Sequence, residues 1–131
     1  MSVIPPAYVD LLGSRTLAHI ATIGPRHEPQ STPVWFGWDG KYILLTLVKT
    51  AQKYRNLRRN PQLALSIVDP ENIYRYLEIR GKVIDFKEDA DRRFVNSLAK
   101  KYLDLDIYPW HRPGDEHIVV IIEPEHTTSM G

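Results

Sequence analysis

Apolar residues recur at every second position along much of the chain, in runs bounded by proline, glycine, asparagine or aspartate. A period of two is the pattern of a β-strand with one face buried. It predicts about six strands, over residues 16–23, 30–38, 42–48, 62–69, 74–86 and 117–123. Short turns join several of them, which favours antiparallel pairing. We therefore expect one domain over residues 1–131, mainly β, built as a small closed barrel with helices on its rim.

Two of the predicted strands contain a residue that disturbs a regular sheet. Pro33 lacks the N–H group that a ladder needs, so it indicates a sheet edge, a bulge, or backbone that faces a ligand. Gly81 predicts a bend or bulge within residues 74–86. Asp39 and Gly40 predict a hairpin turn between the second and third strands.

Helical patterns precede the first strand and the last one. Residues 5–12 begin with two prolines and stop at Gly13, which predicts a short helix that plugs one end of the barrel. A longer helix follows the acidic segment 85–91. Its apolar residues recur at i, i+4 and i+8, and we expect this stripe in the core: Phe94, Leu98 and Tyr102.

A third helix is predicted in the most basic run of the chain, residues 49–61, with Thr50 as N-cap and Pro61 as the stop. At about 100° per residue, the face that carries Thr50, Tyr54 and Leu57 turns inward, and Lys53 borders it. A lysine in a first helical turn lies close to free backbone N–H groups and the positive end of the helix dipole. Lys53 is therefore predicted to bind a phosphate. Arg55 and Arg59 point away from this face and are expected to be solvated.

The charge balance and composition exclude several function classes. The 131 residues carry a net charge of +1, which argues against nucleic acid as a partner because such proteins are strongly basic. The chain has no cysteine, which excludes thiol nucleophiles and disulfides. No apolar run has the length of a membrane span, and the N-terminus lacks the order of a signal peptide. We expect a cytoplasmic protein with no membrane partner.

The histidines show no metal-binding spacing of the HxxxH or HxH kind, and none lies in a nucleophile-elbow context: His19, His27, His111, His117 and His126. There is also no glycine-rich dinucleotide loop and no Walker loop. We expect no metal site, and any redox chemistry would belong to a bound cofactor.

Four segments together resemble the split β-barrel, flavin-binding superfamily of pyridoxamine 5′-phosphate oxidase, and within it the deazaflavin (coenzyme F420)-dependent reductases. They are PQSTPVWF at 29–36, DG at 39–40 with LLT at 44–46, KYRNLRRNP at 53–61 and YRYLEIRG at 74–81. The most specific of them is the third, which has the form Lys-x-x-Asn-Leu-Arg-x-Asn-Pro. The resemblance extends from residue 11 to about residue 124.

This resemblance implies a homodimeric, six-stranded antiparallel split barrel with two cofactor sites between the barrels. It implies that Lys53 binds the cofactor phosphate and that one strand runs along the ring through Thr32, Pro33, Val34 and Trp35. A second strand end and the turn after it would hold the ribityl-phosphate arm through Thr46, Lys49, Thr50 and Gln52. Two tyrosines would reach the site from the partner subunit: Tyr74 and Tyr76.

The function implied is hydride transfer between coenzyme F420 and a small unsaturated or conjugated organic substrate, with no catalytic side chain assigned. The alternatives are an FMN-binding protein of the pyridoxamine 5′-phosphate oxidase type and a non-catalytic cofactor-binding barrel. Residues 122–131 lack the C-terminal arginines of the oxidases that act on vitamin B6. Some deazaflavin-binding relatives have an arginine where this chain has Ala51, so the phosphate turn carries no extra charge there. Affinity for the charged tail of the cofactor would then depend on Lys49 and Lys53. Trp110, in the aromatic loop 104–115, is either a lid or a packing anchor.

Overall fold

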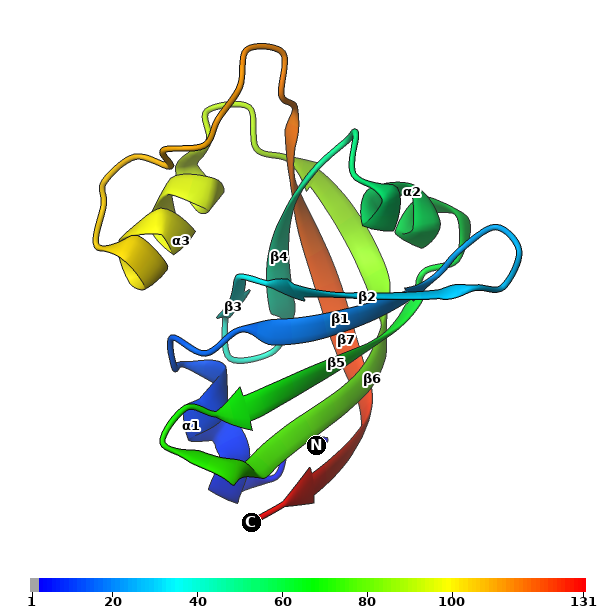
Figure 1. The fold of residues 1–131 in the computed structure, drawn as a ribbon, viewed down its shortest axis with the longest axis vertical. Coiled ribbons are helices and arrows are strands. Elements are labelled where there is room, and N and C mark those ends of the chain that lie inside the picture. The colour runs from blue at the N-terminus through cyan, green and yellow to red at the C-terminus, as the bar shows by residue number, and fades with distance from the viewer. Residues whose placement is uncertain (1–2) are drawn as a thin grey trace.

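Seven strands form one antiparallel sheet in the computed structural model, which describes residues 3–131 (Figure 1). In chain order, the strands are β1 (Ala18–Ile23), β2 (Pro29–Val34), β3 (Phe36–Trp38), β4 (Ile43–Val48), β5 (Gln62–Asp69), β6 (Asn72–Glu88) and β7 (His117–Met130). The helices are the 3-10 turn η1 (Pro6–Tyr8), α1 (Val9–Leu12), α2 (Gln52–Arg59) and α3 (Arg93–Leu103). The expected mainly β, antiparallel fold is confirmed.

The strand predicted over residues 30–38 is in fact two strands, so the sheet has seven strands and not six. β2 pairs with β1, whereas β3 pairs with β4. The order in the sheet is β2-β1-β5-β6-β7-β4-β3, so these consecutive strands are its two ends. Only Trp35 connects them, and the sheet therefore has to curl until its ends meet. Pro33 lies on the end strand β2, as predicted, where one side has no sheet neighbour and a missing N–H is tolerated.

The predicted irregularity at Gly81 is confirmed, because the β6–β7 register shifts between Arg80 and Gly81. A Cβ atom at this position would collide with the carbonyl oxygen of Glu123, so only glycine fits the close approach of the two strands. The strand that was predicted to end at residue 123 continues to Met130, which pairs with Tyr76. The prediction was too short because the second half of β7 is polar, and backbone pairing does not need an apolar pattern.

The inward faces of the strands form the main core. On β1, β4 and β5, buried residues alternate with more exposed ones, which is the period of two expected from the sequence. At one end of the barrel, Leu11 and Leu12 of α1 are 2% and 0% exposed and belong to the same core. The N-terminal helix thus closes this end, as predicted, at the lower side of Figure 1.

Helix α3 packs beside β3, outside the main core (Figure 1). Its buried face consists of Val95, Leu98 and Ala99. Phe94 and Tyr102 are only half-buried, so the prediction that the whole stripe lies in the core was wrong for these two. The expected acidic start of the helix is confirmed in a different form: the buried Asp89 carboxylate precedes α3 and accepts the N–H groups of Phe94 (3.1 Å) and Val95 (3.0 Å).

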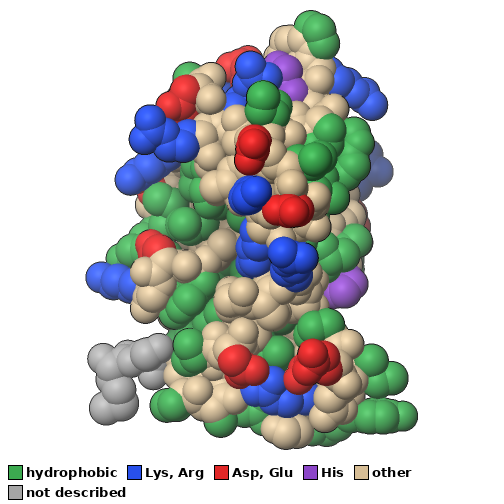
Figure 2. Space-filling view, turned by 90° about the vertical axis from the view of Figure 1, so that its left-hand side faces the viewer, with side chains coloured by type: hydrophobic (Ala, Val, Ile, Leu, Met, Phe, Trp, Pro, Cys, Tyr) green, Lys and Arg blue, Asp and Glu red, His purple; other side chains and the backbone are tan. Residues whose placement is uncertain are grey.

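No helix among residues 3–131 combines the length and the apolar character needed to cross a bilayer. On the face of the molecule that Figure 2 shows, basic and acidic side chains are interspersed.

Candidate functional site

A cavity of about 380 Å³ lies between the edge strand β2, the end of β4, the start of α2 and the loop that follows α3. This size is in the range of pockets that hold small molecules and cofactors. Five of the residues predicted from the sequence line it: Pro33, Val34, Trp35, Thr46 and Lys53. They come from three segments of the chain, residues 33–35, Thr46 and Lys53, and the curling of the sheet between β2 and β3 brings them together.

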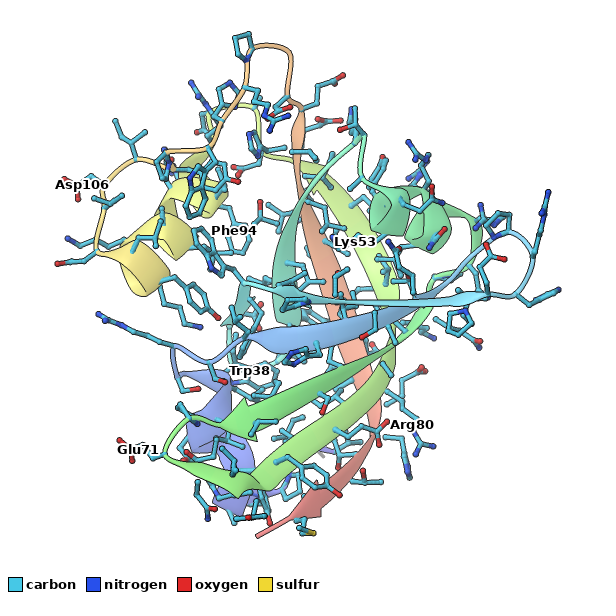
Figure 3. All side chains as sticks on the ribbon, viewed as in Figure 1. Trp38, Lys53, Glu71, Arg80, Phe94 and Asp106 are labelled. Atoms are coloured by element: carbon cyan, nitrogen blue, oxygen red, sulfur yellow. The ribbon has the colours of Figure 1, made fainter. Side chains whose placement is uncertain are left out.

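Two polar groups in this cavity lack partners within residues 3–131. The Thr46 hydroxyl is buried and makes no hydrogen bond there. Lys53 is half-buried, and no ion pair or hydrogen bond of its ammonium group is found in the described part of the chain. Burial lowers the pKa of Lys53 below its ordinary value, because the charged form loses hydration without gaining a counter-ion. Figure 3 shows Lys53 between α2 and the sheet. Buried polar groups are normally satisfied, so these two indicate a ligand with acceptor oxygens.

The first turn of α2 adds backbone donors next to Lys53. The predicted N-cap Thr50 was wrong by one residue: Ala51 is the N-cap, and no side chain caps the helix. The helix begins later because the Ala51 N–H donates to the carbonyl of Val48 (3.0 Å). This hydrogen bond closes a turn that contains Thr50, so Thr50 lies before the helix. The first N–H groups of a helix have no acceptor within the helix. Uncapped, they remain available to an anion.

The inward face of α2 is anchored by Tyr54 and Leu57, as predicted, whereas Thr50 is exposed and precedes the helix, and Asn56 is an addition. Leu57 is 1% exposed and Tyr54 packs against the core. Asn56 is equally buried, and its amide donates to the Thr22 hydroxyl (3.0 Å). Arg59 is exposed, but it also donates to the Asn56 side-chain oxygen (3.0 Å), so it is a structural contact as well as a solvated cation. These contacts fix the orientation of the helix that carries Lys53.

The other residues in the predicted set do not line the cavity: Thr32, Lys49, Thr50, Gln52, Tyr74 and Tyr76. Lys49 forms ion pairs with Glu88 (2.6 Å) and Glu116 (3.1 Å), which raise its pKa. Its charge is therefore already neutralised. Tyr74 is 71% exposed at the start of β6, which lies at the opposite end of the sheet in Figure 1. From that position neither Tyr74 nor Tyr76 reaches the cavity of its own chain.

An aromatic wall, which sequence reasoning located only in part, closes one side of the cavity. The Trp35 ring stacks on Tyr102 with 5.2 Å between centroids and an interplanar angle of 2°. Tyr108 and Trp110 of the loop 104–115 pack against Trp35 at 5.9 and 5.8 Å. Trp110 thus makes the packing contacts of an anchor while 58% of its surface stays exposed. Aromatic residues in that loop were the only sequence signal for this wall.

His117 lines the cavity at the start of β7 and was not among the predicted site residues. It is 5% exposed, and its Nε2 atom lies 2.8 Å from Nδ1 of His111. Burial and the neighbouring His111 lower the pKa of His117, so the neutral imidazole is favoured. The two histidines are six residues apart and form no recognisable motif, because the path of the loop between them brings their rings together.

The sequence and the fold have clear counterparts among known proteins. The sequence matches the family described as pyridoxamine 5′-phosphate oxidase over residues 4–130. A solved structure described as an F420 reductase is 35% identical, with a TM-score of 0.87 over 95% of this chain and 98% of that one. The conserved hypothetical protein Rv2991 from Mycobacterium tuberculosis is 25% identical, with a TM-score of 0.76 over 98% of this chain and 85% of that one.

At lower identity, HupZ of Group A Streptococcus shares the fold, with 22% identity and a TM-score of 0.66 over 96% of this chain and 93% of that one. A comparison with curated proteins finds no match. The family match spans nearly all of the chain. The strands, the cavity and the aromatic wall of this protein all lie within the matched residues. The chain therefore belongs to the pyridoxamine 5′-phosphate oxidase family.

Proposed function

We propose that this protein is an oxidoreductase that binds coenzyme F420 and passes a hydride to a small unsaturated or conjugated organic substrate. The observation that carries the proposal is the pairing of an unpartnered Lys53 ammonium with an unpartnered Thr46 hydroxyl in one cavity. The 35% identity to an F420 reductase over 95% of the chain favours the deazaflavin. When bound, a deazaflavin supplies the hydride chemistry itself.

The residues of this chain would hold and orient the cofactor. Lys53 and the uncapped first turn of α2 would bind its phosphate, because they present a positive charge and free N–H donors side by side. The hydroxyl of Thr46 would donate to an oxygen of the ribityl-phosphate arm. Pro33 and Val34 lie on the edge strand β2, and Trp35 follows them; the side of this strand that does not face β1 has no sheet neighbour among the described residues and can meet a planar ring.

The aromatic wall would exclude water from the reacting face. Trp35, Tyr108 and Trp110 form contiguous apolar surface above the cavity. A dry cavity strengthens the electrostatic contacts to the phosphate and protects a hydride donor from side reactions. Hydride transfer depends on a short distance and a correct orientation between the ring and the substrate more than on an acid or a base. We therefore assign no side chain a catalytic role.

A homodimer is part of the proposal, because the cavity of one chain does not include Tyr74 or Tyr76. Large apolar side chains are exposed where β6 begins and β7 ends: Ile73 and Tyr74 are each 71% exposed, and Met130 is 50% exposed. Covering such side chains is a reason for two copies to associate. Tyr74 and Tyr76 of the partner subunit would then complete the site.

FMN is the second candidate cofactor, since the family match supports a flavin and both cofactors carry a phosphate on a ribityl arm. A fluorescence titration of the purified protein with coenzyme F420 and, in parallel, with FMN tests the proposal. Saturable binding of F420 in clear preference to FMN is the expected result. Preference for FMN would replace the proposed cofactor, and binding of neither would refute a cofactor role for the cavity. Light scattering on the same sample should give the mass of a dimer.

A further inference from the structure

A second cluster of chemically active side chains lies behind the wall of the cofactor cavity. His111 and Asp115 belong to the loop before β7, and His117 is the first residue of that strand. Each offers a ligand atom, and these atoms all lie within 4.8 Å of one another. The three side chains line a separate cavity of about 330 Å³, and His117 lines both cavities. This cluster is independent of the proposed cofactor chemistry.

Hydrogen bonds to the backbone hold Asp115 and His117 in place, and the His111 side chain contacts His117. The carbonyl of His117 accepts the N–H of Asp89 (2.9 Å), which fixes the start of β7. The N–H of Asp115 donates to the carbonyl of Arg112 (3.0 Å), and the Arg112 N–H donates to the Asp115 carboxylate (3.0 Å). This turn, closed at both sides, places the carboxylate next to the histidines. The ligand atoms are thus pre-organised rather than carried on a free loop.

The composition of the cluster selects the kind of ion. Two imidazole nitrogens and a carboxylate oxygen form a ligand set that suits zinc and similar transition metals, whereas Mg²⁺ and Ca²⁺ prefer oxygen alone. The cavity is lined by four carboxylates and one guanidinium: Glu88, Asp89, Asp115, Glu116 and Arg92. Glu88 and Glu116 are paired with Lys49, and Asp89 accepts two N–H groups of α3, so Asp115 is the carboxylate offered to an ion. Since the orienting carboxylate Asp115 is itself hydrogen-bonded, it has the second-shell support that metal ligands require.

The two imidazole nitrogens need only a small adjustment to accept an ion, whereas the Asp115 oxygen, which lies within 4.8 Å of them, would have to move closer. At metal–ligand bonds of about 2.05 Å, tetrahedral ligands lie about 3.3 Å apart. The His111 Nδ1 and His117 Nε2 atoms are now 2.8 Å apart, a separation at which one imidazole donates to the other. To bind an ion, the ring that now donates would carry its proton on its other nitrogen, so that both His111 Nδ1 and His117 Nε2 offer a lone pair. The rings would need to separate by about 0.5 Å, which small rotations of the side chains provide.

We propose that His111, Asp115 and His117 bind one divalent transition-metal ion of the Zn²⁺ class, with a water molecule in the remaining position. The ion would tie the loop 104–115 to the start of β7. That loop carries Tyr108 and Trp110, so metal binding would stabilise the aromatic wall over Trp35. The proposed role of the ion is to hold this loop in place: His111 and Asp115 line only the second cavity, and His117 alone lines both.

Calorimetric titration of the metal-free protein, produced without a polyhistidine tag, with ZnCl₂ tests this site. We expect one ion per chain and an increase in the thermal unfolding temperature, with no effect of MgCl₂ or CaCl₂. Because His117 is buried, its removal could unfold the chain, so the informative variants are His111→Gln and Asp115→Asn. Each should weaken Zn²⁺ binding at least tenfold, while the exposed control His126→Gln leaves it unchanged.

Absorption spectra with Co²⁺ give a second readout, since nitrogen and oxygen ligands in tetrahedral geometry produce visible bands that aqueous Co²⁺ lacks. The proposal is overturned if no saturable binding of Zn²⁺ or Co²⁺ occurs. It is equally overturned if His111→Gln and Asp115→Asn bind Zn²⁺ as well as the unsubstituted chain does.

Discussion

Replacement of Lys53 by methionine should have opposite effects on the stability of the free protein and on its affinity for a phosphate-bearing cofactor. Lys53→Met keeps the apolar stem and removes only the charge. In the free protein this charge is half-buried and unpartnered within the described residues, and burial lowers its pKa. The substitution should therefore leave the free energy of unfolding unchanged or raise it slightly, since solvent screens part of the charge.

Cofactor affinity should fall, because the ammonium–phosphate contact is lost. A hydrogen bond to a charged group contributes about 1.5–3 kcal/mol, which corresponds to a rise in Kd of about 10- to 150-fold. The assay is a fluorescence titration with FMN and with riboflavin, which has the same ring without the phosphate, together with coenzyme F420. Only the phosphate-bearing ligands should lose affinity. A matched control is Lys41→Met, which removes one charge from the exposed hairpin at the far end of β4.

Three outcomes would refute this reasoning. An unchanged Kd for both FMN and coenzyme F420 would show that Lys53 does not contact the phosphate. An equal loss for riboflavin and FMN would show that the lysine contacts the ring or supports the fold. A fall in the stability of the free variant would contradict the view that the ammonium group lacks a partner.

Three further substitutions have definite expected outcomes. Thr46→Val removes the unpartnered buried hydroxyl, so thermal melts should show a free protein as stable as before, and titration should show cofactor binding weaker by about 1 kcal/mol. Burial lowers the pKa of Lys101 to about 8 from 10.5, so between these pH values the unfolded chain binds more protons and stability rises with pH. In denaturant titrations across this pH window, the unfolding free energy of Lys101→Met should not show this rise, which is on the order of 1 kcal/mol after allowance for partial exposure. If the variant and the unsubstituted chain show the same dependence on pH, the assignment is wrong. Gly81→Ala should cost more than about 2 kcal/mol through collision with the Glu123 carbonyl, whereas the control Gly13→Ala meets no close atom and should cost much less.

Part of the candidate site could be predicted because its residues carry local signals. Pro33 disturbs a strand pattern and proved to lie on a sheet edge, and Lys53 follows an apolar strand at a helix start. Both line the cavity. His117 and Tyr108 line it as well, but nothing around His117 marks it as a site residue, and the aromatic loop of Tyr108 gives no indication of where it packs. They reach the site through a loop whose path depends on contacts with Trp35 and with α3.

The amino-acid pattern by itself determined the strands, the antiparallel arrangement and the plug formed by α1, because burial of one strand face and the conformational limits of proline and glycine act within a few residues. Only the tertiary structure decided that residues 30–38 divide at Trp35, and that β7 extends along β6 to Met130. It also decided that Lys49 is neutralised by Glu88 and Glu116 while Lys53 stays unpartnered in the described chain. The physical reason is that pairing partners and counter-ions come from segments distant in sequence, which meet only when the sheet closes on itself.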